Sequence, residues 1–180
     1  MKDKLIELVN QYPHVVLKTP TIPVGVISGS LTQATPDDAN LPWDKSIYEF
    51  CNDLKAAAQA LQMNCLGLAA NQIWKSKEAC PAIFVMRWPI ENYSAWKWQE
   101  VINPKIKVSG KKMKQAEGCL SLMKEGSQTG TPKRRANVTL TYQTLENENQ
   151  ETIKFYGHLG PYAKIVQHEY DHLQGKLCIE

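Results

Sequence analysis

The spacing of apolar residues along the chain predicts two helices. From Asp44, a suitable N-cap, to about Met63, apolar residues recur every three or four positions, which is the period of an amphipathic helix. A second stripe of this kind runs through residues 159–174. Gly175 follows it at the C′ position, where glycine commonly ends a helix. Each helix is expected to bury one face against the rest of the protein.

Runs of β-branched and aromatic residues predict strands in the middle of the chain. Residues 82–88 and 100–102 have this composition, and residues 105–108 continue in extended form. The tryptophan-rich stretch between the first two runs, residues 88–98, is interpreted as a hairpin whose aromatic side chains pack at a surface edge.

A further pair of strands precedes the second helix. Residues 138–142 alternate between apolar and polar types, and residues 152–156 follow them across the polar turn 146–150. Residues 1–43 carry five prolines and are interpreted as an extended, wrapping segment. The predicted fold class is α+β, with antiparallel strands around the C-terminal helix and one mid-chain helix. A chain of 180 residues has room for one ordinary core, so residues 1–180 are predicted to form a single domain.

The charge balance does not suggest nucleic-acid binding. The formal net charge is only +3, and the basic residues are spread along the chain apart from two short clusters. These clusters are Lys111, Lys112 and Lys114, and Lys133, Arg134 and Arg135. Both are interpreted as solvated loop charges.

The termini and the cysteines favour a reduced, cytoplasmic protein. The first residues contain no sustained apolar run of the kind found in secretory signals, and no stretch of the chain reaches membrane-spanning length. The five cysteines are odd in number and irregularly spaced, as expected for free thiols.

The clearest chemical motif is the HExxH pattern at residues 168–172. Four residues bring His168 and His172 onto one helical face, from which both imidazoles can reach the same divalent ion. Glu169 is next to a ligand but poorly placed to be one itself. It is therefore predicted to hold a metal-bound water and to act as general acid and base.

A catalytic site of this type usually has three protein ligands and one open position. Only eight residues follow His172, and Glu180 is the single candidate oxygen ligand among them. The third ligand is therefore expected upstream. Cys119 stands out because it lies in a small polar turn, residues 117–121, where a thiolate could be presented without burial in the core. Cys51 lies at a core-facing position of the first predicted helix and is interpreted as a packed apolar residue.

A third segment of interest is CLGLAANQ at residues 65–72. Its small residues permit close backbone approach, and Gln72 offers an amide donor suited to a developing oxyanion. A helix-terminal turn packed with small residues would have much the same sequence, so the segment alone leaves both interpretations open.

Taken in order, CLGLAANQ (65–72), EGCLS (117–121) and QHEYDH (167–172) resemble the motifs GxGLAAxQ, EGCLS and QHExDH of the peptide deformylase family. The similarity spans most of the chain from residue 65 onward. It implies a hydrolase that removes formate from N-formyl-methionyl peptides of nascent proteins. It also implies one divalent metal ion, usually Fe²⁺ natively, with Zn²⁺, Ni²⁺ or Co²⁺ as substitutes.

The resemblance also implies a role for individual residues. It makes Glu169 catalytic, and it places oxyanion donors in the Gln72 side chain and the Leu120 backbone N–H. It puts Leu66 and Gly67 beside the methionine-binding pocket. The implied metal ligands are Cys119, His168 and His172. The partners implied are the N-formyl-Met peptide and, transiently, the ribosome, with no direct nucleic-acid recognition and no membrane.

The sequence departs from the family pattern at three places. Cys65 replaces the first motif glycine, a change that a negative φ would tolerate. The stretch between Ser121 and Ala136 is longer than usual before the family's arginine, so Arg134 and Arg135 both remain candidates for that role. The chain stops soon after the HExxH helix, as in compact members of the family, viral ones included.

Two other functions are compatible with parts of the pattern. A zincin-like endopeptidase would also use HExxH, but it requires a downstream third ligand. A non-catalytic protein could use the same side chains as a structural zinc clip, although such sites have four ligands and are usually richer in cysteine.

Overall fold

A computed structural model describes residues 9–11, 14–27, 30–33, 47–61, 65–75, 80–122, 129–147 and 149–180. The described helices are α2 (Ile47–Ala60), α3 (Ala70–Ile73) and α4 (Tyr162–Leu173). The described strands are β1 (Val24–Ile27), β2 (Ser30–Gln33), β3 (Gly67–Ala69), β4 (Ile83–Ile90), β5 (Ala95–Lys114), β6 (Glu117–Gly118), β7 (Thr129–Gly130), β8 (Lys133–Gln143) and β9 (Glu151–Tyr156). Single 3₁₀ turns lie at Val15–Lys18, Glu91–Tyr93, Leu120–Leu122 and Gly157–Leu159. The predicted α+β class is confirmed.

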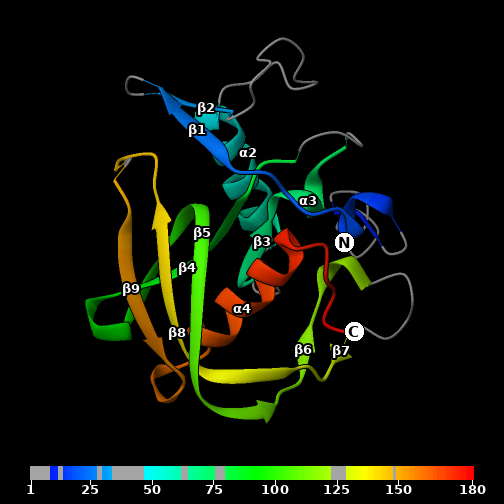
Figure 1. The fold of residues 1–180 in the computed structure, drawn as a ribbon, viewed down its shortest axis with the longest axis vertical. Helices are drawn as coiled ribbons and strands as arrows, with labels where there is room; N and C mark the ends of the chain where they lie inside the picture. The colour runs from blue at the N-terminus through cyan, green and yellow to red at the C-terminus, as the bar shows by residue number, and fades with distance from the viewer. Residues whose placement is uncertain are drawn as a thin grey trace.

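The largest sheet of the described chain has five strands in the order β3-β4-β5-β8-β9 (Figure 1). All its described pairs are antiparallel. The predicted hairpin between residues 82–88 and 100–102 is confirmed as β4 and β5, joined by the turn Glu91–Tyr93. The predicted strand-turn-strand unit is confirmed as β8 and β9. Strands β1–β2 and β6–β7 form two small further sheets.

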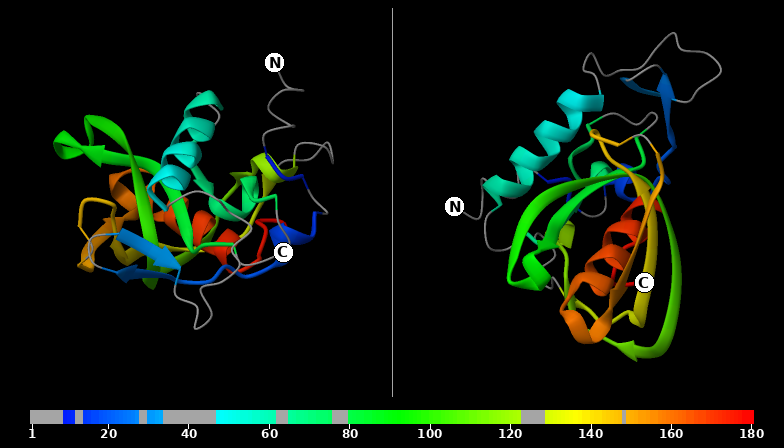
Figure 2. Two further views of the ribbon diagram at one scale, coloured as in Figure 1. Left: turned by 90° about the horizontal axis from the view of Figure 1, so that it is seen from above. Right: turned by 90° about the vertical axis from the view of Figure 1, so that its left-hand side faces the viewer.

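Strand β5 is twice interrupted in its pairing with β8. The register shifts between Ile102 and Lys105, and again between Ser109 and Lys112. At the first shift, Asn103 has a φ of 50°, and its side chain donates to Val24 O at 2.6 Å and accepts from Val24 N at 2.8 Å. Such bulges bend a strand and increase its twist. The bent sheet curls around α4, which lies inside it (Figure 2, right).

The two long helices pack on opposite faces of the sheet. Helix α4 contributes Ala163, Ile165, Val166 and Leu173 to an apolar cluster that includes Phe84, Met86, Val101, Val138 and Leu140. Helix α2 contributes Phe50, Cys51, Leu54 and Ala58 to another, with Leu68, Ile83, Val85 and Ile102. Alternate residues of β4 therefore enter different cores, as the two-residue period of a strand requires. Cys51 is packed as predicted.

Helix α4 ends where the sequence indicates. Gly175 has a φ of 69°, and a Cβ there would lie 2.5 Å from the carbonyl oxygen of Lys18. A residue with a side chain would meet both a left-handed conformation and a backbone clash, so glycine is needed at this C′ position. This close approach joins the end of α4 to the N-terminal segment.

Some predictions about the outer parts of the chain are wrong. Residues 15–18 form a 3₁₀ turn with Val16 and Leu17 buried, not an extended segment. The basic clusters at 111–114 and 133–135 lie in strands β5 and β8, not in loops. The predicted helix limits Asp44 and Met63 lie outside the described residues, as do Pro13, Pro36 and Pro42. Among the helices of the described chain, none has the length and apolar character needed to span a bilayer.

Candidate metal centre

Helix α4 presents two histidines one turn apart toward a cysteine from the loop after β6. The ring centroids of His168 and His172 are 4.9 Å apart, as the four-residue spacing predicts. The Sγ atom of Cys119 lies 3.3 Å from Nε2 of His172. One ligand atom from each of these three residues lies within 4.8 Å of the other two. The structure therefore brings together the three side chains that the sequence singled out.

This geometry fits a divalent cation. Metal–sulfur bonds of about 2.3 Å and metal–nitrogen bonds of about 2.0 Å would place tetrahedral ligand atoms roughly 3–4 Å apart. Nδ1 of His172 is buried without a hydrogen-bond partner in the described structure, and burial holds the pKa of His172 well below its ordinary value. This histidine is thus neutral, which is the form that binds a metal. The one-sulfur, two-nitrogen donor set suits Zn²⁺, Fe²⁺ or Co²⁺.

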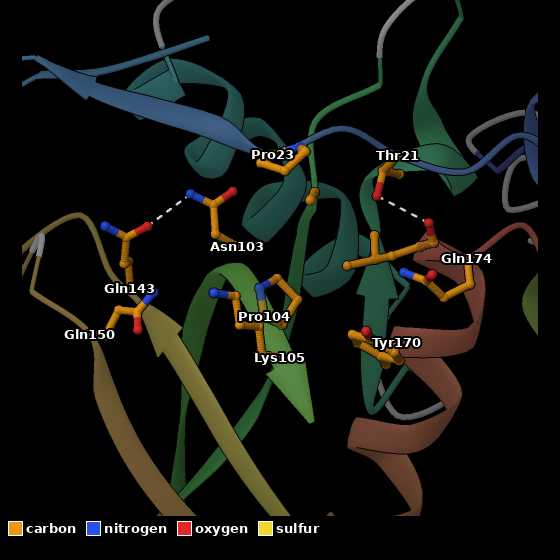
Figure 3. Close-up of a pocket in the computed structure, with 11 residues that line it drawn as sticks. Thr21, Pro23, Asn103, Pro104, Lys105, Gln143, Gln150, Tyr170 and Gln174 are labelled. Atoms are coloured by element: carbon orange, nitrogen blue, oxygen red, sulfur yellow. Dashed lines mark hydrogen bonds between the residues drawn. The ribbon is translucent and has the colours of Figure 1, made fainter. Parts of the chain in front are cut away.

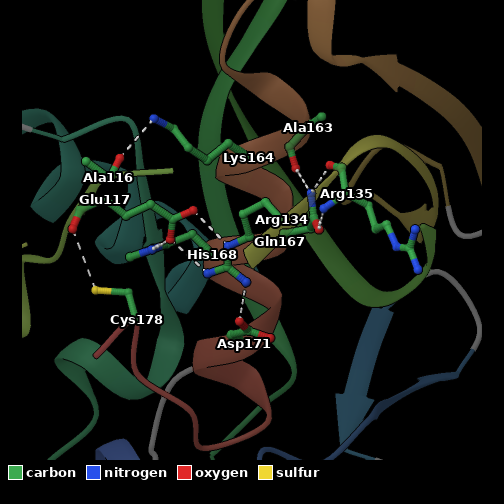
Figure 4. A network of polar contacts seen from close by, with 10 residues as sticks. All are labelled: Ala116, Glu117, Arg134, Arg135, Ala163, Lys164, Gln167, His168, Asp171 and Cys178. Carbon is green, nitrogen blue, oxygen red and sulfur yellow. Dashed lines mark hydrogen bonds and ion pairs between the residues drawn. The ribbon is translucent and has the colours of Figure 1, made fainter. Parts of the chain in front are cut away.

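A buried ion-pair network orients His168 (Figure 4). Oε2 of Glu117 lies 2.9 Å from Nδ1 of His168, which leaves Nε2 of that ring for a cation. Arg134 in turn donates two hydrogen bonds, of 2.7 and 2.8 Å, to the Glu117 carboxylate, and it also pairs with Asp171 on α4. Burial opposes ionisation of Glu117, but the hydrogen bonds from Arg134 and His168 outweigh it and hold the pKa of this carboxyl below its ordinary value.

The same network identifies which arginine belongs to the site. Arg134 is only 5% exposed, whereas Arg135 is exposed and donates to the carbonyl oxygen of Gly110 at 3.0 Å. The sequence did not decide between the two, and it did not single out Glu117 or Asp171 as supports. Both acidic residues lie inside the quoted motifs EGCLS and QHEYDH, so their position beside the ligands was the available signal.

Glu169 follows His168 on helix α4 and is buried. Its side chain is buried, Oε2 has no hydrogen-bond partner in the described structure, and burial raises its pKa to about 7. A carboxyl with this pKa can take up and release a proton near neutral pH. A Cβ at Gly67 would lie 2.5 Å from Oε1 of Glu169. A larger residue at position 67 would therefore displace the Glu169 carboxyl group from its present position.

The CLGLAANQ segment forms β3 and the start of α3, directly against α4. Gln72 is buried; its Oε1 accepts from Ala69 N at 2.9 Å, and its Nε2 donates to Ser121 Oγ at 3.2 Å. An amide nitrogen has two hydrogens, so one donor is left. Asn71, which sequence reasoning missed, donates to the carbonyl oxygen of His172 at 2.6 Å. The motif thus anchors the last turn of the ligand helix.

Two further predicted residues, Leu66 and Leu120, are next in sequence to Gly67 and Cys119. Leu66 is 41% exposed, directly before Gly67. Leu120 begins the 3₁₀ turn after Cys119, and its carbonyl oxygen accepts from Gln11 Nε2 at 3.0 Å. Cys65 does not have a positive φ, which confirms that the backbone there tolerates a residue other than glycine.

Cys119 is less accessible than the sequence suggested. It is only 4% exposed and belongs to a small apolar cluster with Leu17, Leu122, Leu177 and Cys178, so the expectation of a thiol outside the core is wrong. The contact with the Cys178 thiol, together with burial, raises the pKa of Cys119 well above its ordinary value. Its thiolate form therefore depends on a bound cation. Cys178, which the sequence did not indicate, contacts Cys119 but is outside the three-ligand group.

A separate pocket of about 310 Å³ lies on the other side of α4, near Tyr170 (Figure 3). Its lining mixes polar and apolar side chains, and Asn103 and Gln143 are joined there by a 2.8 Å hydrogen bond. The lining residues are Thr21, Pro23, Ala82, Asn103, Pro104, Lys105, Gln143, Gln150, Tyr170, Leu173 and Gln174. None of the predicted site residues lines it, so it is distinct from the metal centre.

Comparison with known proteins shows which family this chain resembles. A peptide deformylase of Wolbachia pipientis wMel is 37% identical over 122 residues, covering 63% of this chain and 62% of the relative. The match thus spans about three fifths of that curated relative. Two solved structures share the fold over most of their length. One, described as a probable peptide deformylase from Synechococcus phage S-SSM7, has a TM-score of 0.70 at 24% identity and covers 95% of this chain and 96% of its own.

The other is a class I type b peptide deformylase from Acinetobacter baumannii with Met-Ala-Ser bound. It has a TM-score of 0.65 at 25% identity and covers 95% of this chain and 94% of its own. The family model for polypeptide deformylase matches residues 6–180, which is nearly the whole chain. On the strength of this match and of the site assembled above, the chain belongs to the peptide deformylase family.

Proposed function

We propose that this chain removes the formyl group, as formate, from peptides that begin with N-formylmethionine. The observation that carries the proposal is the grouping of Cys119, His168 and His172 around a buried Glu169 whose pKa is raised to about 7. Family membership and the Met-Ala-Ser tripeptide bound to the Acinetobacter baumannii relative indicate the substrate class. The proposed setting is the cytoplasm, on nascent chains and in transient contact with the ribosome.

The cofactor we propose is one divalent ion, Fe²⁺ natively, with Zn²⁺, Ni²⁺ or Co²⁺ as substitutes. Cys119, His168 and His172 would hold it and leave one position for water. When bound, the ion would act as a Lewis acid and lower the pKa of that water toward about 7.

The chain's own residues would carry the proton and bind the developing charge. Glu169 would take the proton from the attacking water and return it to the leaving amine, for which a pKa near 7 is well matched. The second amide hydrogen of Gln72 and the backbone N–H of Leu120 would donate to the oxygen of the formyl group as it becomes negative. Exclusion of water from the buried carboxyl strengthens each of these interactions.

Methionine selectivity would come from Leu66 and Gly67. Leu66 exposes apolar surface one residue from the glycine that Glu169 touches, so a substrate side chain there would lie close to the reacting carbon. The test compares kcat/KM for formyl-Met-Ala-Ser and formyl-Asp-Ala-Ser. We expect a preference for the methionyl peptide of at least about tenfold, because an apolar site cannot solvate the aspartate. Equal values would contradict the assignment of Leu66.

The decisive test of the proposed reaction is Glu169→Gln. Formate release from formyl-Met-Ala-Ser should fall by about 10²–10⁴, the usual contribution of general acid–base catalysis, while metal content per chain stays unchanged. Loss of metal from the folded variant would instead make Glu169 a ligand or a structural support.

The same assay separates the alternatives. A zincin-like endopeptidase would cleave an unformylated internal peptide bond, and a structural zinc protein would release no formate from any peptide. Either result with metal-loaded wild-type protein would overturn the proposal.

A further inference from the structure

Strands β5, β8 and β9 gather seven cationic side chains on one face. Residues directly opposite each other in antiparallel strands point to the same side of the sheet. The register places Lys112 opposite Arg135 and Lys114 opposite Lys133. It also places Thr139 between Lys107 on one neighbouring strand and Lys154 on the other. The seven residues are exposed and are here called the basic outer face: Lys105, Lys107, Lys112, Lys114, Lys133, Arg135 and Lys154.

No acidic residue occupies a paired position on this face of the three described strands. The positions between the cations carry hydroxyl and amide side chains, at Ser109, Asn137, Thr139, Thr141 and Thr152. The whole chain has a formal charge of +3, and the seven residues contribute +7, so the remaining residues sum to 3 − 7 = −4. Positive charge is therefore segregated onto this face of an otherwise acidic molecule.

This clustering of like charges destabilises the folded protein. Like charges directly opposite each other on neighbouring strands repel, and the face contains two such pairs, Lys112 with Arg135 and Lys114 with Lys133. Within the described residues, the Arg135 guanidinium donates to the carbonyl oxygen of Gly110 and not to a carboxylate. A surface that serves solubility alone mixes the two signs of charge. The segregation therefore indicates an anionic partner.

The basic outer face is on the side of the sheet away from α4. Its neighbours on the other side, Val138 and Leu140, pack in the same cluster as α4. Helix α2 also lies on the outer side, but it packs against β3, β4 and the first part of β5 (Figure 2). The far part of β5, with β8 and β9, thus presents the cations to solvent while the metal centre faces the interior of the curved sheet.

We propose that the basic outer face binds the phosphate backbone of double-stranded RNA without reading its sequence. Lysine and arginine with interspersed hydroxyl and amide groups are the side chains that contact phosphates and sugars. Duplex RNA is recognised mainly through its phosphates and 2′-hydroxyls. On this face of the described strands, Tyr156, whose ring is tilted at 37° to that of His158, is the one aromatic side chain at a paired position, so a stacking platform for unpaired bases is lacking there.

A membrane surface fits this face less well. Interfacial binding requires apolar side chains that enter the lipid alongside the basic ones. The paired positions between the cations are polar, apart from Tyr156. The substrates in the proposed function emerge from an RNA-containing particle, and a duplex bound outside the sheet would leave the metal centre inside it accessible. RNA binding nevertheless depends on the charges alone and does not require deformylation.

The test measures fluorescence anisotropy of a labelled RNA duplex with the metal-loaded protein over a series of KCl concentrations. The face variant is Lys107→Gln/Lys112→Gln/Lys154→Gln. The matched control, Lys18→Gln/Lys97→Gln/Lys176→Gln, removes the same charge at exposed positions off this face. The face variant should bind at least about tenfold more weakly at low salt, and its slope of log K against log salt should decrease by about 2–3. The control should change affinity by less than about threefold.

Three outcomes would overturn the proposal: no salt-sensitive binding of wild type to the duplex, equal losses in both triple variants, or tighter binding to phosphatidylserine vesicles than to RNA. If circular dichroism shows that the triple variant does not fold, the three single variants are measured in its place. Each should lower the slope of log K against log salt by about 0.7–0.9. Formate release from free formyl-Met-Ala-Ser should be the same in wild type and face variant. Failure of that activity in wild type would refute the proposed function and leave the RNA result standing.

Discussion

Strand β8 contains two neighbouring arginines that point to opposite sides of the sheet. Arg134 points inward, is 5% exposed and joins Glu117 to Asp171. Arg135 points outward, beside Lys112 across the strand pair. In the sequence the two residues belong to one basic cluster, yet the two-residue period of a strand sends one to the metal centre and the other to the basic outer face.

The comparison shows that residue type alone does not define a charged residue's role. Arg134 is buried with two carboxylate partners and, through Glu117, orients the candidate metal ligand His168. Arg135 is exposed opposite a lysine and adds to the positive electrostatic potential of the outer face. The two faces should therefore respond independently to substitution.

The largest effect is expected from Cys119→Ala. Metal affinity should fall by more than about a hundredfold because a thiolate ligand is lost, and formate release should disappear with the metal. RNA affinity of the basic outer face should not change. The measurement is metal content per chain, with circular dichroism as a control for folding.

Cys178→Ala is the matched control for this prediction. Cys178 contacts Cys119 but is outside the three-ligand group, so its removal should leave one metal per chain. The same result is expected for Cys51→Ala, Cys65→Ala and Cys80→Ala. A folded Cys119→Ala protein that binds metal as tightly as wild type would rule out this coordination sphere.

The next effect is on stability, in the comparison of Arg134→Met with Arg135→Met. Loss of Arg134 leaves Glu117 buried without its bidentate partner, which should cost about 3–5 kcal/mol in the free energy of unfolding. Loss of Arg135 at an exposed position should change it by less than about 0.5 kcal/mol. Urea unfolding of the metal-free proteins measures both. Similar losses would show that the inward and outward positions are not distinct.

The pH dependence of stability sharpens the same contrast. The pKa of Glu117 is held below its ordinary value of 4.5, so its contribution is present above that pH and is lost as the pH falls. Without Arg134, burial counteracts this shift, and the acid-induced loss of stability from Glu117 should flatten. The urea midpoint of metal-free wild type and Arg134→Met, followed from pH 6 to about pH 3, tests this. Parallel curves would contradict the role of Arg134.

How far the sequence predicts this molecule depends on whether a feature is local. The metal ligands and Glu169 lie in short contiguous motifs, and their chemistry follows from spacing and residue type. The hairpins and α4 follow from periodicity. The supporting residues Glu117, Asp171 and Asn71 lie inside those motifs, but only tertiary structure shows which atoms they contact.

The basic outer face could not be predicted in this way. Its members come from three strands, and the register that aligns them depends on two bulges in β5. Asn103-Pro104 and Ser109-Gly110 mark breaks in the strand pattern, but such dipeptides do not say by how much the register shifts. The buried position of Cys119 is similar, because Leu17 and Leu177, which cover it, are far away in the sequence. Properties set by pairing across the chain appear only once the register is known.

The smallest expected effect is an increase in stability when one outer cation is removed. Lys112→Thr removes the repulsion with Arg135 and introduces a residue that favours strands, so the free energy of unfolding should rise by about 0.2–1 kcal/mol. Raising the salt concentration should reduce the gain that comes from repulsion, because exposed charges are screened. A double-mutant cycle with Arg135→Thr separates the Lys112–Arg135 repulsion from strand propensity. The propensity effects of the two substitutions add, whereas either substitution alone already removes the repulsion. A coupling energy near zero at low salt would show that the two cations do not repel each other, and that the face has no stability cost requiring a functional explanation.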